Sequence, residues 1–189
     1  MAMSFLELAA RRESTRRYAP APVPREALER CLEAARLAPS ACNSQPWKFI
    51  VVDSEPLRGR LVGEAFKGIY RMNRFVEQAP VLIVIVTERS KYAAQLGGQF
   101  RGIQYSLVDI GIAGEHLALQ AAEEGLGTCW LGWFNERGVK KVLRLPRSAR
   151  VDIILSLGYP AEPGPREKKR KTLDVIREYR VDPVKAHER

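Results

Sequence analysis

The run from Val81 to Thr87, Val-Leu-Ile-Val-Ile-Val-Thr, constrains the fold more than any other part of the chain. Its residues are apolar and mostly β-branched, which favours the extended backbone of a strand. Because the run has no polar alternation, neither of its faces suits contact with water. It therefore predicts a strand at the centre of a sheet.

Periodic apolar patterns mark the other elements. The predicted helices cover residues 4–11, 25–37, 54–74, 105–125 and 135–145. The predicted strands besides the central one cover residues 48–53, 128–131 and 150–157. The strand at 48–53 is apolar enough to predict burial on both faces. The helix at 105–125 is lined by small residues, which predicts close packing against a second helix or a partner subunit.

Composition places the chain among ordinary globular proteins, since 46% of its 189 residues are hydrophobic and 28% are charged. We expect one domain over residues 1–189, in which residues 161–189 form an extended C-terminal arm because they are rich in proline and charge. No stretch approaches the ~18 consecutive apolar residues of a membrane span, and residues 1–12 lack the apolar run of a signal peptide. The three cysteines show no paired spacing, so we expect reduced thiols in a cytoplasmic protein.

Positive charge is concentrated in two clusters, at residues 11–17 and 166–171, within a formal net charge of +9. Such clusters suit nucleic acid, an anionic membrane surface or a phosphorylated ligand. Neither cluster is interleaved with stacking aromatic residues, so we expect no nucleic acid as a partner. A phosphorylated ligand needs only a few cations brought together, which two clusters could supply.

In the first cluster, Arg12, Ser14 and Arg16 fall on one side of an extended backbone. Two guanidinium groups and a hydroxyl on one side suit a phosphate, because arginine forms bidentate, charge-assisted bonds to its oxygens. The alternative is a solvated run of charge that binds nothing.

A polar loop joins the helix at 25–37 to the strand that follows it. Pro39 and Pro46 restrict its backbone on both sides. Between them, four side chains can donate or accept hydrogen bonds at close range: Ser40, Asn43, Ser44 and Gln45. This composition indicates either a ligand cradle or a structural turn that caps its own backbone.

Two side chains, His116 and Cys129, allow both a structural and a chemical interpretation. His116 lacks a neighbouring carboxylate or cysteine pattern, so a structural role is favoured over a base or a metal ligand. Cys129 lacks a partner base, so packing in a strand is favoured over a nucleophile. No residues have the spacing of a metal site, and Gly125-x-Gly127 lacks the third glycine of a dinucleotide fingerprint.

Four stretches, taken together, resemble a known family. Pro39-Ser-x-x-Asn-Ser-Gln-Pro-Trp47 resembles the signature loop of the FMN-dependent nitroreductase family. Arg12-x-Ser-x-Arg16, Gly125-Leu-Gly-Thr-x-Trp130 and the basic stretch 168–173 resemble three further elements of that family, and all four occur in the family's order. The resemblance spans most of the chain, from Arg12 to about residue 176.

The resemblance implies an α+β fold with a central mixed sheet flanked by helices. It implies an intertwined homodimer whose C-terminal arm reaches the partner subunit, with FMN at the interface. The implied activity is reduction of a nitroaromatic, quinone or similar small acceptor by NADH or NADPH, with ping-pong hydride transfer through flavin N5. The alternatives are a dehalogenase or flavin-processing enzyme of the same family, or a non-enzymatic flavin-binding protein.

The resemblance also implies a set of FMN-binding residues. They are Arg12, Glu13, Ser14, Arg16, Pro39, Ser40, Ala41, Asn43, Cys129, Trp130, Leu131, Gly132, Lys168 and Arg170. The phosphate is expected at Arg12, Ser14, Lys168 and Arg170, and the isoalloxazine at Pro39, Ser40 and Asn43 with main-chain groups of 129–132. No catalytic side chain is implied, since the chemistry belongs to the flavin. Substrate selection is expected in residues 88–104, where Tyr92 and Phe100 could stack on a ligand or pack in the core.

Overall fold

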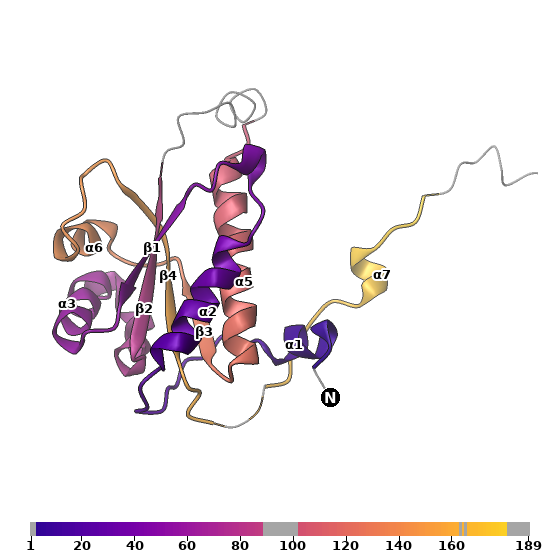
Figure 1. The fold of residues 1–189 in the computed structure, drawn as a ribbon, viewed down its shortest axis with the longest axis horizontal. Coiled ribbons are helices and arrows are strands. Elements are labelled where there is room, and N and C mark those ends of the chain that lie inside the picture. The colour runs from indigo at the N-terminus through magenta and orange to yellow at the C-terminus, as the bar shows by residue number, and fades with distance from the viewer. Residues whose placement is uncertain (1–2, 89–101, 163, 165, 181–189) are drawn as a thin grey trace, which may run out of the picture.

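The computed structural model describes residues 3–88, 102–162, 164 and 166–180, and Figure 1 shows its fold. Four strands form one sheet in the order β1-β2-β4-β3. They are β1 (Trp47–Val52), β2 (Val81–Thr87), β3 (Gly127–Leu131) and β4 (Arg150–Gly158). Tyr92 and Phe100 lie outside the described residues.

The pairs β1–β2, β2–β4 and β3–β4 are all antiparallel. The α+β class with a helix-flanked central sheet is confirmed, but the expectation of a mixed sheet needs correction for these four strands. Among the described residues, the parallel contribution is an isolated bridge between Ser14 and Thr128 at the outer edge of β3. Apolar patterning could not settle this, since it is the same whichever way a neighbouring strand runs.

Helices cover both faces of the sheet (Figure 1). One face is covered by α2 (Arg25–Arg36) and α5 (Tyr105–Glu123), which pack against each other. The opposite face is covered by α3 (Glu55–Ala65), the 3-10 helix η2 (Gly68–Gln78) and α6 (Glu136–Val142). The predicted packing of the long helix against a second helix is therefore confirmed.

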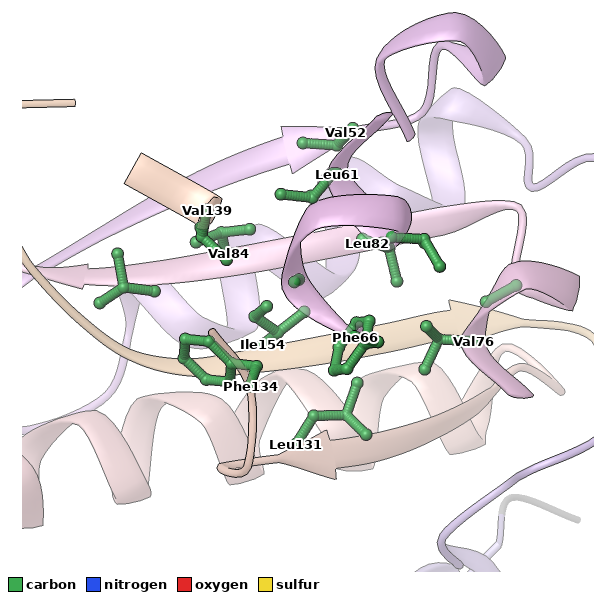
Figure 2. Close-up of a cluster of buried hydrophobic side chains, with 14 of the residues drawn as sticks. Val52, Leu61, Phe66, Val76, Leu82, Val84, Leu131, Phe134, Val139 and Ile154 are labelled. Carbon is green, nitrogen blue, oxygen red and sulfur yellow. The ribbon is translucent and has the colours of Figure 1, made fainter. Parts of the chain in front are cut away.

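Alternate residues of β2 point into two separate cores, as the period of a strand requires. Leu82 and Val84 belong to the cluster under α3, η2 and α6, which Figure 2 shows packed around Phe66. Val81 and Ile83 belong to the cluster under α2 and α5. The central strand is thereby buried on both faces, as its sequence predicted.

β1 departs from its expected burial. Of its six residues, only Val52 is fully buried. The prediction of burial on both faces is wrong for most of this strand, because β1 lies at the edge of the sheet and the helical layers cover an edge less completely than the centre.

The single helix expected over residues 54–74 is also corrected. α3 ends at Ala65, and Phe66 and Lys67 have non-helical backbone angles. Gly68 then adopts a φ of 60°, a left-handed conformation that glycine tolerates better than other residues. The chain continues as the tighter turns of η2, so two shorter elements replace the expected one.

Both chain ends carry short helices. α1 (Phe5–Arg11) begins with the predicted capping box, in which the Ser4 hydroxyl accepts from the Glu7 N–H and the Glu7 carboxylate accepts from the Ser4 N–H. α7 (Leu173–Ile176) belongs to a segment that stands away from the body in Figure 1. None of the helices in the described part of the chain is long and apolar enough to cross a membrane.

Candidate functional site

The two basic clusters meet in space although about 150 residues separate them. We call the hollow between them the cationic pocket; its volume is about 320 Å³. A second hollow of about 410 Å³ adjoins it, and Arg12 and Glu13 line both. The lining of the cationic pocket consists of Arg12, Glu13, Ser14, Arg16 and residues 166–170. We call residues 166–170 the strap. The structure therefore brings all six expected site residues from the two chain ends to one place.

The first wall of the pocket is an extended segment held along β3. Ser14 forms its parallel bridge with Thr128, and the Thr15 N–H donates to the Thr128 carbonyl at 2.8 Å. Gly127 makes room for this approach, because a Cβ there would lie 2.2 Å from the Thr15 hydroxyl oxygen. The Tyr18 hydroxyl bonds the Thr15 carbonyl at 2.9 Å, and burial raises the pKa of Tyr18 so that this hydroxyl stays protonated. The wall is thus fixed on its inner side.

The strap is tied to this wall through main-chain oxygens. The Lys168 ammonium donates to the carbonyl of Ala9, at 2.9 Å, and to that of Arg12, at the end of α1. The Arg166 guanidinium donates to the Ser14 carbonyl at 2.6 Å, and its backbone N–H donates to the Glu13 carboxylate at 2.8 Å. Glu13 and Lys168 therefore hold the strap in place, whereas the sequence suggested that both contact a ligand.

The pocket has an excess of positive charge. Six cationic side chains line it, from Arg12, Arg16, Arg166, Lys168, Lys169 and Arg170, against the two carboxylates of Glu13 and Glu167. Burial lowers the pKa of the Lys168 ammonium from its ordinary value, and repulsion by Arg12 and Arg170 lowers it further. A site that opposes protonation of its own lysine favours an anion, and a phosphate fits this donor set.

Arg12 is positioned by a carboxylate on α5. Its guanidinium Nε lies 3.3 Å from the Glu115 carboxylate, and its side chain is only 18% exposed. This contact leaves the outer N–H groups of the guanidinium for a ligand in the pocket. Glu115 thus orients a residue that the sequence placed at the phosphate.

Residues 129–132 continue from the bridge along the end of β3. Burial raises the pKa of the Cys129 thiol more than the nearby arginines lower it, so the thiol stays neutral. This supports the interpretation of Cys129 as a packing residue rather than a nucleophile. The Trp130 ring lies against α5, where a Cβ on Gly114 would come within 2.4 Å of it. Leu131 is buried and Gly132 is exposed.

The polar loop, residues 38–45, adopts an unusual backbone. It contains the 3-10 turn η1 (Ala41–Asn43), and three of its non-glycine residues have positive φ angles: Cys42 at 52°, Asn43 at 52° and Gln45 at 44°. The Ser40 hydroxyl accepts from the Gln45 N–H at 2.9 Å, and the Asn43 side-chain oxygen accepts from the Gln45 amide at 3.0 Å. The loop therefore does cap its own backbone, as the structural alternative predicted, while it presents polar groups outwards.

The polar loop and the cationic pocket lie apart within one protomer. The loop packs at the start of α5, where the Ala41 N–H donates to the Asp109 carboxylate at 3.0 Å. α1 lies towards the other end of α5 (Figure 1). Asp109 and Glu115 are six residues apart, a rise of about 9 Å along the helix. Pro39, Ser40, Ala41 and Asn43 are not among the residues that line the cationic pocket.

Sequence reasoning missed four residues that shape the site, one of which is Glu115, the partner of Arg12. Arg166 and Lys169 line the cationic pocket, and their signal was present in the basic cluster, although the family pattern pointed to Lys168 and Arg170 instead. Asp109 holds the polar loop, and its signal was an acidic residue among the apolar and small residues of the first turns of α5. His116 lies 3.3 Å from the Ala34 carbonyl through Nδ1, which supports its structural interpretation.

Comparison with known proteins places this arrangement in a family. Residues 9–159 match the model of the Nitroreductase family. The chain is 33% identical over 182 residues to an NADH dehydrogenase from Thermus thermophilus, covering 82% of this chain and 86% of that protein. It is 29% identical over 180 residues to an iodotyrosine deiodinase from Thermotoga neapolitana, covering 85% and 90% of the two proteins.

A solved structure gives the same answer for the fold. An FMN-dependent nitroreductase from Clostridium difficile superposes with a TM-score of 0.71 at 29% identity, covering 94% of this chain and 99% of that one. The chain therefore belongs to the nitroreductase family, as the four sequence elements predicted.

Proposed function

We propose that this chain is an FMN-dependent oxidoreductase that uses NADH or NADPH to reduce small acceptors such as nitroaromatics and quinones. The observation that carries the proposal is the cationic pocket, which this chain, a member of the nitroreductase family, forms from residues near its two ends. Support for FMN comes from the related Clostridium difficile protein, which is described as FMN-dependent. When bound, FMN supplies a ring that takes up a hydride and passes electrons to a second small molecule.

The cationic pocket is proposed to hold the FMN phosphate. Arg12 and Arg170 would provide charge-assisted bonds, and the Ser14 hydroxyl would donate a further one. Lys168 uses two of its three N–H donors on the carbonyls of Ala9 and Arg12, so one donor remains for the phosphate. Arg16 is an exposed residue at the pocket, from which its side chain would reach beyond the phosphate.

The remaining expected residues are proposed to face the flavin ring. They are Pro39, Ser40, Ala41 and Asn43 of the polar loop, with main-chain groups of Cys129, Trp130, Leu131 and Gly132. None of them needs to act as an acid, a base or a nucleophile, because their part is to bind and orient the ring. The raised pKa of Cys129 is consistent with that passive part.

A homodimer is proposed because one protomer leaves the site in two pieces. The polar loop lies apart from the cationic pocket, so a second copy of the chain would bring its own loop to complete each pocket. The arm also offers exposed apolar side chains, since Leu173, Val175 and Tyr179 are 64%, 65% and 80% exposed. In this proposal residues 1–189 form one FMN-binding domain, and the arm of residues 161–189 lies on the partner.

The location proposed for the protein is the cytoplasm. Cys31, Cys42 and Cys129 are all free, which is the usual state of thiols in a reducing compartment. Basic residues from both chain ends gather around a pocket suited to a small anion, which supports a small-molecule partner rather than nucleic acid.

The test is purification under gentle conditions, followed by anaerobic titration with NADH and then with NADPH. We expect a yellow protein whose visible flavin band bleaches with at least one nucleotide and returns when a nitroaromatic or a quinone is added. A yellow protein that neither nucleotide bleaches would be a flavin carrier. A protein that contains no flavin and takes up none overturns the proposal.

A second candidate function is reductive dehalogenation, within the same flavin-dependent class. The observation that favours it is the similarity to the iodotyrosine deiodinase from Thermotoga neapolitana. Release of iodide from iodotyrosine by the reduced protein, measured beside reduction of a nitroaromatic under the same conditions, distinguishes the two. The faster reaction identifies the better function.

A further inference from the structure

Asp109 is an acidic side chain in the interior of the protein. It lies on the buried side of α5 and is 3% exposed. One carboxylate oxygen accepts the hydrogen bond from the Ala41 N–H at 3.0 Å. The second oxygen is buried and has no hydrogen-bond partner among the described residues. Burying a carboxylate with so little compensation is unfavourable, so its presence calls for a structural or functional reason.

The polar loop supplies that reason. Left-handed backbone angles are disfavoured for residues that carry a Cβ, and Cys42, Asn43 and Gln45 all adopt them. Such angles persist only where the surroundings hold them. The hydrogen bonds of the loop through Ser40 and Asn43 are local, within five residues. Among the described residues, the Ala38 N–H bonds the Ala35 carbonyl at the end of the preceding helix α2, and the bond from Ala41 to Asp109 is the hydrogen bond that joins this loop to α5.

We propose that Asp109 is a positioning residue, which holds the polar loop in its left-handed conformation so that Ser40 and Asn43 meet the flavin ring correctly. The inference rests on the proposed function, in which this loop contacts the isoalloxazine. Asp109 itself does not touch the ring. It acts through the Ala41 N–H, which it fixes at the first residue of η1.

The proposal separates two kinds of variant. Asp109→Ala removes the acceptor, so the loop loses its tie to α5 and the ring contacts are no longer preorganised. Asp109→Asn keeps an oxygen that can accept from the Ala41 N–H, and its amide replaces the oxygen that has no partner. The second variant should therefore behave like the parent, although it lacks the negative charge.

Asp152 provides a matched control. Its side chain is also buried, at 4% exposure, but it lies on β4 and binds Arg150 and the Thr87 hydroxyl rather than the polar loop. Asp152→Ala therefore removes a buried carboxylate without touching the site. It should lower the thermal midpoint of the protein and leave flavin binding unchanged.

The measurements are the dissociation constants for FMN and for riboflavin, the visible circular dichroism of bound flavin, and hydrogen exchange at the Ala41 amide. For Asp109→Ala we expect both flavins to bind about 10- to 150-fold more weakly, the equivalent of one lost bond to a charged group. Equal losses are expected because the polar loop faces the ring and not the phosphate. The dichroism should change, and the Ala41 amide should lose its protection.

Flavin affinity and dichroism that stay at parental values in Asp109→Ala overturn the proposal. So does an equal loss of affinity in Asp152→Ala, or a loss in Asp109→Asn as large as that in Asp109→Ala. A parent that binds no flavin while its Ala41 amide stays protected overturns the proposed function, and with it the flavin role of Asp109. Hydrogen exchange thereby distinguishes that failure from failure of the anchor itself.

Discussion

The cationic pocket and the polar loop are two parts of one proposed site, and they are built differently. The pocket joins residues 12–16 to a strap from the other end of the chain, through bonds from cations to main-chain oxygens. The loop is one continuous segment with an unfavourable backbone, held by local bonds and by Asp109. Charge attraction tolerates small displacements, whereas contacts to a flat ring need a fixed backbone. A charged pocket can therefore be formed by segments that are distant in sequence and loosely joined, whereas a surface that fits a flat ring needs one segment with a fixed backbone.

The largest expected effect comes from removing charge at the pocket. Arg12→Ala combined with Arg170→Ala should weaken FMN binding by about 3–6 kcal/mol, since each charge-assisted bond contributes about 1.5–3 kcal/mol. The double variant should purify colourless, and titration with FMN should measure the loss. Riboflavin, which lacks the phosphate, should bind the variant and the parent alike.

Arg25→Ala combined with Arg60→Ala is the matched control. Arg25 pairs with Asp53 away from the pocket, and Arg60 is exposed on α3. This variant loses the same net charge, so it should bind FMN as the parent does. A double variant at Arg12 and Arg170 that remains as yellow as the parent would remove these residues from the phosphate site.

The second effect concerns α5, which separates the two regions. Gly114→Ala would place a methyl group 2.4 Å from the Trp130 ring, and overpacking of this kind costs about 1–3 kcal/mol of unfolding free energy. Gly111→Ala on the same helix meets no atom within 4 Å, and it should stabilise the protein by about 0.5–1 kcal/mol. Urea unfolding of both variants checks the contrast, and equal shifts would contradict the packing seen at Trp130.

The third effect is a pH dependence of FMN binding. In the protein without ligand, the pKa of the Lys168 ammonium is lowered from 10.5. A bound phosphate favours the charged ammonium and so raises this pKa again. Between the pKa of the free protein and that of the complex, binding of FMN therefore takes up a proton. FMN affinity should therefore fall as the pH rises through the lowered pKa of Lys168, by at most about tenfold per pH unit. Lys168→Met should remove this slope when the dissociation constant is measured across the alkaline range.

Without a ligand, the same group affects stability with the opposite sign. The unfolded chain binds the Lys168 proton more tightly than the folded protein does. The empty protein should therefore gain stability from this group as the pH rises from the lowered pKa towards 10.5. An identical pH profile of unfolding for parent and Lys168→Met would show that the Lys168 pKa does not affect the free energy of unfolding.

The smallest effect tests the backbone of the polar loop. Cys42→Gly relieves a left-handed Cβ that costs about 1–2 kcal/mol, while glycine adds about 0.5–1 kcal/mol of unfolded-state entropy. The net change in unfolding free energy should be a gain of at most about 1.5 kcal/mol. Cys42→Val should shift the urea midpoint the other way, because a β-branched residue is poorly tolerated at positive φ.

Sequence reasoning succeeded where the pattern itself carries the physics. β2 and α2 followed from apolar runs and periodicity, and the capping box at Ser4 followed from residue type and spacing. It failed where the answer depends on the place of a strand in the sheet or on the backbone angles of a few residues. The exposure of β1 follows from its place in the sheet, and the division of α3 from η2 depends on the backbone at Gly68.

The candidate site shows the same limit at the level of single residues. The family pattern located the basic stretch 168–173, but nothing in the spacing tells that Lys168 donates to the carbonyls of Ala9 and Arg12. Likewise, the loop residues were found from their resemblance, while Asp109, 68 positions away from Ala41, was not. Residue type shows which groups can bind, and the fold decides which of their donors are already used.

The strap also affects how readily the protein is degraded when its ligand is lost. Residues 166–170 supply four of the six cations, and they lead directly into α7. A bound anion lowers the repulsion among these cations, so it also secures the junction of the two termini. We expect the emptied protein to fray at both ends together, and a protease should cut its arm sooner than that of the filled protein.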